Sequence, residues 1–297
     1  MKHYLLILLF AMFVYSCGTS KEVANKTNTT EVPTTTTPQI TVGTGVKVAT
    51  TKPVSEMQTK PPMAATDSVV EINKQAFTPP TPVEQFDHTV WNELLTQYVT
   101  PDGKVNYDGF RRNSTTLRAY IKALGENMPN ERWTKNDKLA YWMNAYNAMT
   151  VDLIVRNLPL ASIKDIDKPW DQRLWKLGEK WYNLDEIEHK ILRKMDEPRI
   201  HFGINCASFS CPPLLNAAFT SKTVNFQLEQ LTATFINDTK RNTITSDEIK
   251  ISKIFNWFAK DFKQNGSLID FLNTYASTTI NNNARVRYLD YNWSLNN

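Results

Sequence analysis

The sequence lacks several features that mark common classes of function. Its nine glycines are scattered and never fall into the G-x-G-x-x-G or P-loop spacing, so we expect no phosphate cradle and no bound cofactor. The net charge of +4 is small for 297 residues, and no run of basic residues stands out. Because binding to a nucleic-acid backbone needs a clustered basic face, neither DNA nor RNA is expected as a partner.

Residues 1–17 have the pattern of an export signal. Met1-Lys2 gives a positive start, and Tyr4 to Tyr15 is an apolar run too short to span a bilayer. The small residue Ser16 then precedes Cys17, an ending that resembles a bacterial lipobox, in which the cysteine is acylated and becomes the mature N-terminus. We therefore expect a lipoprotein attached through Cys17 to a membrane of the bacterial cell envelope. A simply cleaved signal and an N-terminal membrane anchor are the alternatives.

Residues 18–82 and residues 83–297 differ in composition. The first segment is rich in Thr, Pro, Val and Lys, and Phe77 is its only aromatic residue. Because it cannot bury enough apolar surface to offset the entropy of ordering, it is predicted to be a disordered tether. The second segment holds all eight tryptophans and is long enough for a sizeable core. We expect one globular domain there, of the α+β class, with several amphipathic helices packed around a small sheet.

The segment 199–213 holds several side chains that can take part in catalysis or metal binding, among them a histidine, an asparagine and two cysteines. Apolar residues alternate with polar or small ones over 200–206, which predicts a strand of the small sheet with His201 on its polar face. The two cysteines that remain besides the lipobox residue, Cys206 and Cys211, are close enough in sequence for a turn to bring them within bridging distance. In an oxidising compartment we expect a disulfide between them. A reactive thiolate and a pair of inert buried thiols are the alternatives.

The strongest helix signal covers residues 135–156. Thr134 followed by Asp137 is an N-terminal capping pattern, and a wide apolar stripe runs along the segment. Asn147 falls at the edge of this stripe and Asn144 lies farther round. Because a buried amide must find partners, Asn147 is expected either to hold neighbouring backbone or to orient a reacting group.

A second helix with a capping signal is predicted over residues 183–195. Glu188 lies inside its apolar stripe, while His189 lies to the side. Burying a carboxylate is costly unless it is paired or hydrogen-bonded. Glu188 is therefore expected either to pair with an arginine such as Arg193 or Arg199, or to orient a histidine or act as an acid or base.

Three tryptophans lie at irregular spacing within residues 168–181, which are predicted to form a loop or short strand. They are Trp170, Trp175 and Trp181. Indole rings on a surface can stack on sugars or contact a partner, and these three are therefore candidates for binding. Packing in the core is the alternative.

Four segments together resemble the DUF547 family, a domain family of unknown function. Trp142-Met-Asn-Ala-Tyr-Asn-Ala is similar to its W-x-N-x-Y-N-A helix, and the segment that begins at Leu184 is similar to its L-x-x-I-E-H-x-x-L-R element. The segment that begins at His201 is similar to its H-F-x-x-x-C-x-x-x-S-C-P stretch. The segment that begins at Tyr291 is similar to its Y-D-W-S-L-N ending, with Asn292 where the family usually has aspartate.

This resemblance implies no settled activity, but the motifs of the family indicate seven candidate functional residues. They are Asn144, Asn147, Glu188, His189, His201, Cys206 and Cys211. The asparagine at position 292 removes one acidic candidate, which suggests that the terminal motif is structural.

Two functions compete at this point. The first is a binding or scaffold module on a lipidated tether, whose Trp- and Tyr-rich surface holds a glycan, a peptide or an envelope protein. The alternative is a cysteine-dependent hydrolase or acyl-transfer enzyme with Cys206 as nucleophile, activated by His189 or His201, and with Glu188 or an asparagine fixing the imidazole. The two histidines with Cys206 and Cys211 could also form a tetrahedral metal set, but their separations match no familiar zinc spacing, so no metal is expected.

Overall fold

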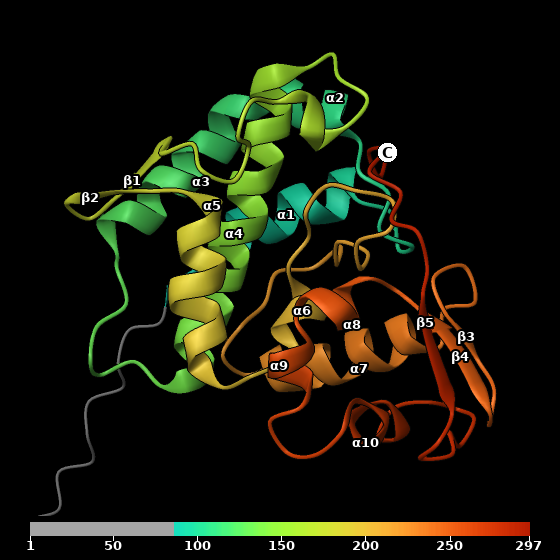
Figure 1. Ribbon diagram of the computed structural model, residues 1–297. Coiled ribbons are helices and arrows are strands. Elements are labelled where there is room, and N and C mark those ends of the chain that lie inside the picture. Colours follow the sequence, from blue (N-terminus) through green and yellow to red (C-terminus); the bar gives the residue numbers. More distant parts are fainter. Residues whose placement is uncertain (1–85) are drawn as a thin grey trace, which may run out of the picture. The chain divides into compact units, whose positions relative to one another are not determined.

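Helices are the main regular elements of the structure, a computed structural model that describes residues 86–297 (Figure 1). The predicted export signal, Cys17 and the predicted tether over residues 18–82 lie outside the described residues. The α-helices are α1 (Thr89–Tyr98), α2 (Tyr107–Arg112), α3 (Ser114–Glu126), α4 (Lys135–Asn157), α5 (Leu184–Glu186), α6 (Ile200–Gly203), α7 (Val224–Ile236), α8 (Ile254–Trp257), α9 (Ala259–Phe262) and α10 (Leu268–Asn273). Three further helical segments are η1 (Ile163–Asp165), η2 (Ile187–Ile191) and η3 (Leu192–Met195).

The strands form two small sheets. β1 (Trp175–Leu177) and β2 (Lys180–Tyr182) make an antiparallel hairpin. β3 (Thr243–Ile244) pairs antiparallel with β4 (Glu248–Ile251), and β4 pairs in parallel with β5 (Arg285–Tyr288). The predicted α+β class is confirmed.

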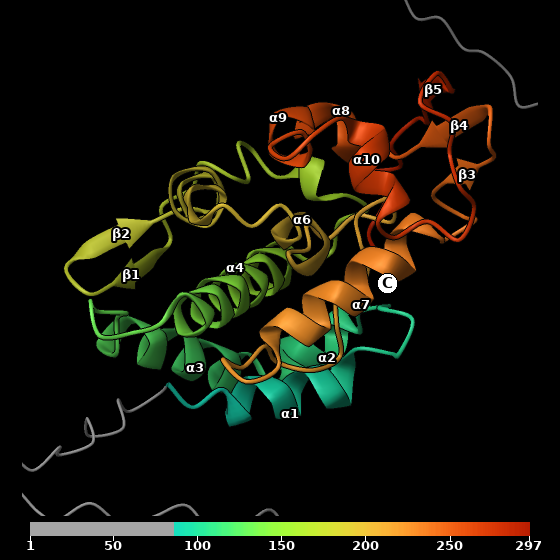
Figure 2. The ribbon, with the colours of Figure 1, turned by 90° about the horizontal axis from the view of Figure 1, so that it is seen from below.

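Helix α4 is the centre of the larger apolar core. Figures 1 and 2 show it between α1–α3 on one side and the continuous segment α5–η3 on the other, with α7 alongside. A second core, rich in phenylalanine, lies among α7–α10 and the three-stranded sheet, and its buried members include Phe202, Phe235 and Phe255. The chain therefore packs around two apolar clusters rather than one.

Local signals explain why α4 begins and stays buried. The Thr134 hydroxyl accepts from the Asp137 N–H at 3.2 Å, and the Asp137 carboxylate accepts from the Thr134 N–H at 2.9 Å, which is the predicted capping box. Farther along, the buried carboxylate of Asp152 accepts from Trp175 Nε1 at 2.9 Å and from Arg118 Nε at 2.9 Å. These bonds tie α4 to β1 and α3.

The predicted strand over residues 200–206 is wrong. Ile200–Gly203 is the helical turn α6, closed by the bond from the Ile204 N–H to the Ile200 carbonyl at 2.9 Å. The alternation that suggested a strand has another cause. Ile200 and Ile204 belong to the core around α4, whereas Phe202, on the other side of the turn, belongs to the second core. One helical turn between two cores needs apolar residues on both sides, and this imitates the period of a strand.

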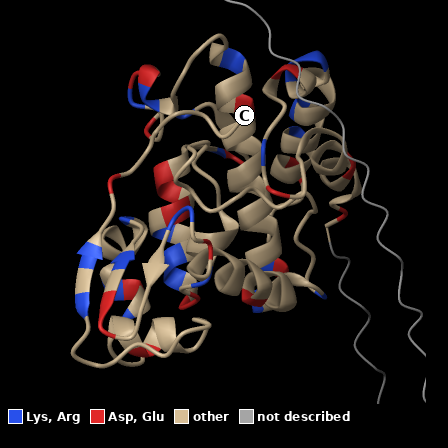
Figure 3. Cartoon of the chain, turned by 90° about the vertical axis from the view of Figure 1, so that its right-hand side faces the viewer, with Lys and Arg blue, Asp and Glu red and all other residues tan. Residues whose placement is uncertain are grey.

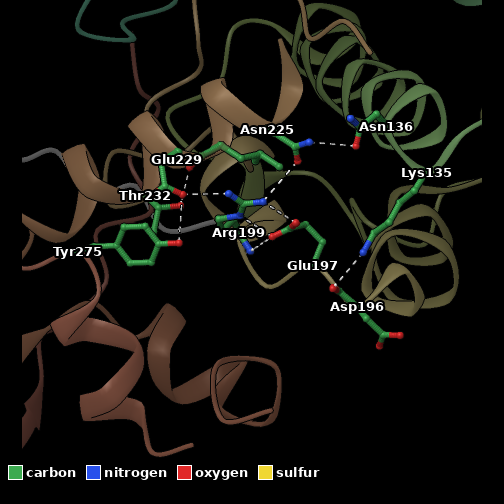
Figure 4. A network of polar contacts seen from close by, with 10 residues as sticks. Lys135, Asn136, Asp196, Glu197, Arg199, Asn225, Glu229, Thr232 and Tyr275 are labelled. Carbon is green, nitrogen blue, oxygen red and sulfur yellow. Dashed lines mark hydrogen bonds and ion pairs between the residues drawn. The ribbon is translucent and has the colours of Figure 1, made fainter. Parts of the chain in front are cut away.

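A polar network fixes the segment that leads into α6 (Figure 4). The Arg199 guanidinium donates twice to the Glu197 carboxylate, at 2.7 Å each, and once to Glu229 on α7 at 3.0 Å. The Tyr275 hydroxyl, just after α10, donates to the same Glu229 carboxylate at 3.4 Å. Only a fifth of the Arg199 side chain is exposed, so these pairs are partly shielded from solvent. They hold the start of α6 against α7.

Charges of both signs are interspersed over the described chain (Figure 3). The blue segments on the strands at the lower left belong to β4 and β5, which carry Lys250, Arg285 and Arg287. Glu248 lies among them and pairs with Arg287 at 3.1 Å. Within residues 86–297, no helix combines the length and the apolar character that crossing a membrane requires.

Candidate functional site

A cavity of about 410 Å³ lies where the two cores meet the C-terminal segment. Its lining comes from α4, α5, η2, α6 and α8, from the loop after α6 and from two loops distant in sequence. The lining residues are Tyr146, Trp170, Asp171, Asp185, Glu188, His189, His201, Ile204, Cys206, Cys211, Pro212, Ile254, Trp257, Phe258, Tyr291 and Trp293. Six of the predicted site residues thus line one cavity, namely Trp170, Glu188, His189, His201, Cys206 and Cys211.

The loop after α6 presents Cys206 to this cavity through a tight turn. Ala207, which is fully buried, has a φ of 60°, a left-handed conformation that is costly for a residue with a Cβ. The Asn205 side chain holds the turn together, because it accepts from the Ala207 N–H and donates to the Pro212 carbonyl, both at 2.8 Å. The two prolines after Cys211 prevent the loop from continuing as a helix.

The C-terminal segment closes the loop from outside. The Phe209 N–H donates to the Ser294 carbonyl at 2.8 Å, and the Ser210 N–H donates to the Asn292 carbonyl at 3.2 Å. The Asn292 side chain accepts locally from the Ser294 N–H at 2.9 Å and does not line the cavity. Asn292 thus serves the backbone of the terminal motif, as the missing carboxylate suggested.

Cys206 and Cys211 are free thiols in the structure, so the predicted disulfide is not formed. The turn instead places the Cys211 sulfur against the backbone of Cys206, whose N–H donates to it at 3.0 Å. The Cys206 sulfur contacts the Ser208 hydroxyl at 3.1 Å and the Tyr291 hydroxyl at 3.3 Å. The Ser208 hydroxyl in turn donates to Tyr291 at 3.1 Å, so the three groups form a closed set.

These contacts give the two thiols different pKa values. Hydrogen bonding from the Cys211 thiol, with help from Ser208 and Tyr291, lowers the pKa of Cys206 from 9.0 to about 7 despite its burial. Burial and the neighbouring Cys206 thiolate raise the pKa of Cys211 well above its ordinary value. Cys206 is therefore the thiol that ionises near neutral pH, whereas Cys211 stays protonated there.

Glu188 sits on an unusual stretch of helix. Residues Ile187–Ile191 form a π-helical turn, a distortion that is frequent at functional sites. The Glu188 carboxyl is buried and accepts from the Tyr146 hydroxyl at 3.0 Å. Its pKa is raised, chiefly because burial penalises the charged form. Neither Arg193 nor Arg199 forms an ion pair with it, since both are bonded to other carboxylates.

The two histidines belong to one polar chain. His201 Nε2 lies 2.8 Å from a carboxylate oxygen of Asp261, and its ring stacks on Phe258 with centroids 3.9 Å apart. Arg193 donates twice to the same carboxylate, at 2.6 and 2.9 Å, and contacts His189 Nδ1 at 3.0 Å. Burial lowers the pKa of His201, while its own bond and Arg193 hold the pKa of Asp261 far below the usual range. His201 is thus a neutral imidazole oriented by an ionised carboxylate.

The two asparagines of α4 are backbone clamps rather than cavity residues. Asn147 donates to the Gly203 carbonyl and accepts from the Asn205 N–H, both at 2.9 Å. Asn144 makes the same pair of bonds with the backbone of Phe219, at 2.8 and 3.0 Å. Neither lines the cavity, and Asn147 positions Cys206 only through the backbone of the loop before it.

The three tryptophans predicted for binding have three different environments. Trp170 lines the cavity and packs edge-on against Trp293, with centroids 5.8 Å apart. Trp175 is a core residue, 3% exposed, that donates to Asp152. Trp181 on β2 is 53% exposed and lies away from the cavity.

A metal centre does not fit this arrangement. Among residues 86–297, no three His, Cys, Asp or Glu side chains converge as metal ligands. His201 contacts Asp261. His189 contacts Arg193 through Nδ1, and its Nε2 lies 3.5 Å from the Asp185 carboxylate. The four residues considered as a tetrahedral set do not form one.

Comparison with known proteins gives one match. Residues 130–236 match the family model described as "Protein of unknown function, DUF547". Residues 130–236 therefore carry a DUF547 domain. The matched segment includes α4, the π-helical turn with Glu188 and His189, and the loop with both cysteines. Neither the curated proteins nor the solved structures yield a match.

The DUF547 segment does not contain the whole cavity. Asp261 and Tyr291, which contact His201 and Cys206, lie C-terminal to it, as do Trp257 and Trp293. Sequence reasoning missed Asp261, because nothing local distinguishes it from other charged residues on an amphipathic helix. Tyr291 carries a signal in the sequence, since it opens the Tyr291-Asn-Trp-Ser-Leu-Asn motif, but the asparagine at position 292 points to a structural role for that motif and away from the contact with Cys206.

Proposed function

We propose that the domain is a cysteine-dependent acyl-transfer enzyme or hydrolase with Cys206 as its nucleophile. The observation that carries the proposal is the environment of Cys206. This residue lines a cavity, its sulfur contacts the hydroxyls of Ser208 and Tyr291, and its N–H donates to the Cys211 sulfur. A thiolate is the nucleophilic form of cysteine, and donors around it favour that form near neutral pH.

The neighbouring groups can supply the proton transfers. The Cys206 thiolate would attack a carbonyl carbon, forming a thioester as the bond from that carbon to the leaving group breaks. Glu188 holds its proton more tightly than an ordinary carboxyl, which suits it to protonate the leaving group. Nε2 of His201 donates its proton to Asp261 in a hydrogen bond, so Nδ1 keeps a free lone pair. This lone pair can take a proton from a water that attacks the thioester carbonyl, and the bond from that carbon to the Cys206 sulfur then breaks, releasing the acid and restoring the thiolate.

The test is to trap the thioester. The purified chain is mixed with a para-nitrophenyl ester, and the release of para-nitrophenol is followed together with the intact mass. We expect a burst of phenol and an acyl adduct that peptide mapping places on Cys206. Cys206→Ala should abolish both, while Cys211→Ala should retain the adduct but form it more slowly near neutral pH. An equal burst in Cys206→Ala, or no adduct in the unmodified chain, would reject the nucleophile.

A binding module remains the second candidate, because an aromatic wall favours it. Trp257, Tyr291 and Trp293 lie side by side at the cavity, with ring centroids 4.6 to 5.8 Å apart. Such surfaces stack on sugars, peptides and other flat or apolar groups. Glycan-array and peptide binding by Cys206→Ala that matches that of the unmodified chain, together with absent acylation, would favour this function.

We also propose that Cys17 is acylated and displays the domain on the bacterial cell envelope. The support is the sequence alone, namely the positive start, the short apolar run and the small residue before the cysteine. Metabolic labelling with palmitate should mark the chain in bacteria and should fail with Cys17→Ala.

A further inference from the structure

The cavity around Cys206 is lined by acidic and aromatic side chains. Asp171 and Asp185 are among its lining residues, and both are accessible to solvent. No lysine or arginine lines this cavity in the part of the chain that the structure describes. The wall therefore offers negative charge to an occupant and no fixed positive charge.

The aromatic side of the cavity is continuous and reaches the thiol. Trp170 packs edge-on against Trp293, which stacks on Trp257 at 5.8 Å, and Tyr291 lies 4.6 Å from Trp293. The hydroxyl of that same Tyr291 contacts the Cys206 sulfur at 3.3 Å. A group held against the aromatic rings would therefore lie beside the nucleophile.

One cation of the protein itself already lies against these aromatic rings. The ammonium of Lys164 lies over the Trp293 ring, 5.4 Å from its centroid, although Lys164 does not line the cavity. Aromatic faces attract ammonium and guanidinium groups, and the attraction strengthens when the cation is desolvated. Arg193 lies over the ring of Phe258, 5.2 Å from its centroid, and is bonded through two nitrogens to Asp261, so the Asp261 carboxylate offsets its charge.

We propose that the cavity selects acyl donors that carry an ammonium group, of the kind found on a lysine-like side chain. The ammonium would lie against Trp257, Tyr291 and Trp293 and toward the carboxylates of Asp171 and Asp185, with the acyl carbon at Cys206. This substrate class rests on the proposed function, because it assumes that Cys206 is acylated.

The experiment compares two esters that differ in charge and little in shape. The para-nitrophenyl esters of Nα-acetyl-lysine and Nα-acetyl-norleucine are used with the full chain, and kcat/KM is measured for each after subtraction of spontaneous hydrolysis. We expect a preference for the lysine ester of roughly three- to thirtyfold, the range that a cation–π contact gives. In Asp171→Asn/Asp185→Asn the ratio should fall, because only the contact with the aromatic rings remains to favour the ammonium group. Glu126→Gln, which removes an exposed carboxylate on α3, should retain it.

The outcomes separate this inference from the proposed function. If Cys206 is acylated at least as fast by the norleucine ester, the substrate class is wrong while the enzyme stands. If neither ester acylates Cys206, the enzyme is rejected and the selectivity is decided by binding. In that case Cys206→Ala is titrated with Nα-acetyl-lysine amide and with Nα-acetyl-norleucine amide, and tryptophan fluorescence is followed. Tighter binding of the lysine amide supports a cation-selective cavity, and equal or weaker binding overturns it.

Discussion

Replacing Cys211 with alanine should raise the pKa of Cys206, because it removes the first of the donors that favour the thiolate. A pKa of about 7 instead of 9.0 corresponds to roughly 3 kcal/mol in favour of the ionised form. At pH 7, roughly half of the Cys206 side chains are then thiolate, compared with about 1% for an unperturbed cysteine. Without Cys211, the hydroxyls of Ser208 and Tyr291 remain, so the pKa should settle between the two values.

The assay is the rate of alkylation by iodoacetamide as a function of pH. In the unmodified chain we expect the rate at Cys206 to rise with a midpoint near pH 7, since only the thiolate reacts. Cys211, whose pKa is raised, should react slowly over the same range. In Cys211→Ala the midpoint should move up by about one pH unit or more. Tyr291→Phe should move it in the same direction by less, and it retains the packing of the ring.

Two controls make the result decisive. Cys206→Ala reports the residual reaction of Cys211, and circular dichroism shows whether each variant keeps its fold. A midpoint near 9 in the unmodified chain would refute the reasoning, and so would a midpoint that neither substitution moves. A chain in which neither thiol reacts even after unfolding would instead support the disulfide expected from the sequence.

Three further predictions concern stability and are checked by urea denaturation. Asp152→Ala leaves Trp175 Nε1 buried without its acceptor and should lower the free energy of unfolding by about 2–4 kcal/mol. Gly203→Ala would place a Cβ 2.2 Å from Met143 Cε in a filled core, and should cost about 1–3 kcal/mol. Burial lowers the pKa of His88 from 6.5 to about 4, so the unfolded chain binds its proton more tightly. The free energy of unfolding should therefore fall as the pH drops from about 6.5 to about 4, and His88→Gln should flatten that decline.

Local signals made part of the fold predictable. The capping box at Thr134 and Asp137 and the apolar stripe behind it are sequence patterns whose partners lie within one or two turns, and α4 follows them closely. The same holds for Asn183, which accepts from the Glu186 N–H at 2.9 Å and starts the second predicted helix. Such elements depend little on the rest of the chain.

The strand predicted over residues 200–206 failed because periodicity does not reveal how many cores surround a segment. Phe202 faces one apolar cluster, whereas Ile200 and Ile204 face the other. Nothing in the local sequence distinguishes this arrangement from a strand with one buried face. Only the tertiary packing decides between them.

The sequence predicted the residues in the central loop of the candidate site, but not the residues that contact them from distant segments. His201 and Cys206 were identified because they lie in one short, unusual stretch. Asp261 and Tyr291 are 60 and 85 residues away from the groups they contact, and contacts of that separation leave no trace in a single sequence. The role of Asn147 shows the converse. It was singled out correctly as a buried amide, but only its partners, Gly203 and Asn205, reveal it as a clamp.

The separation between Cys206 and Tyr291 also has a kinetic consequence. Bringing their segments together requires closure of an 85-residue loop, which is among the slower kinds of contact to form during folding. Until the Tyr291 hydroxyl arrives, the sulfur lacks one of the donors that hold it as a thiolate. The rate at which Cys206 reacts at neutral pH during refolding should therefore report when the C-terminal segment docks. The reactivity of Cys206 is thus an internal probe of the last tertiary contacts to form.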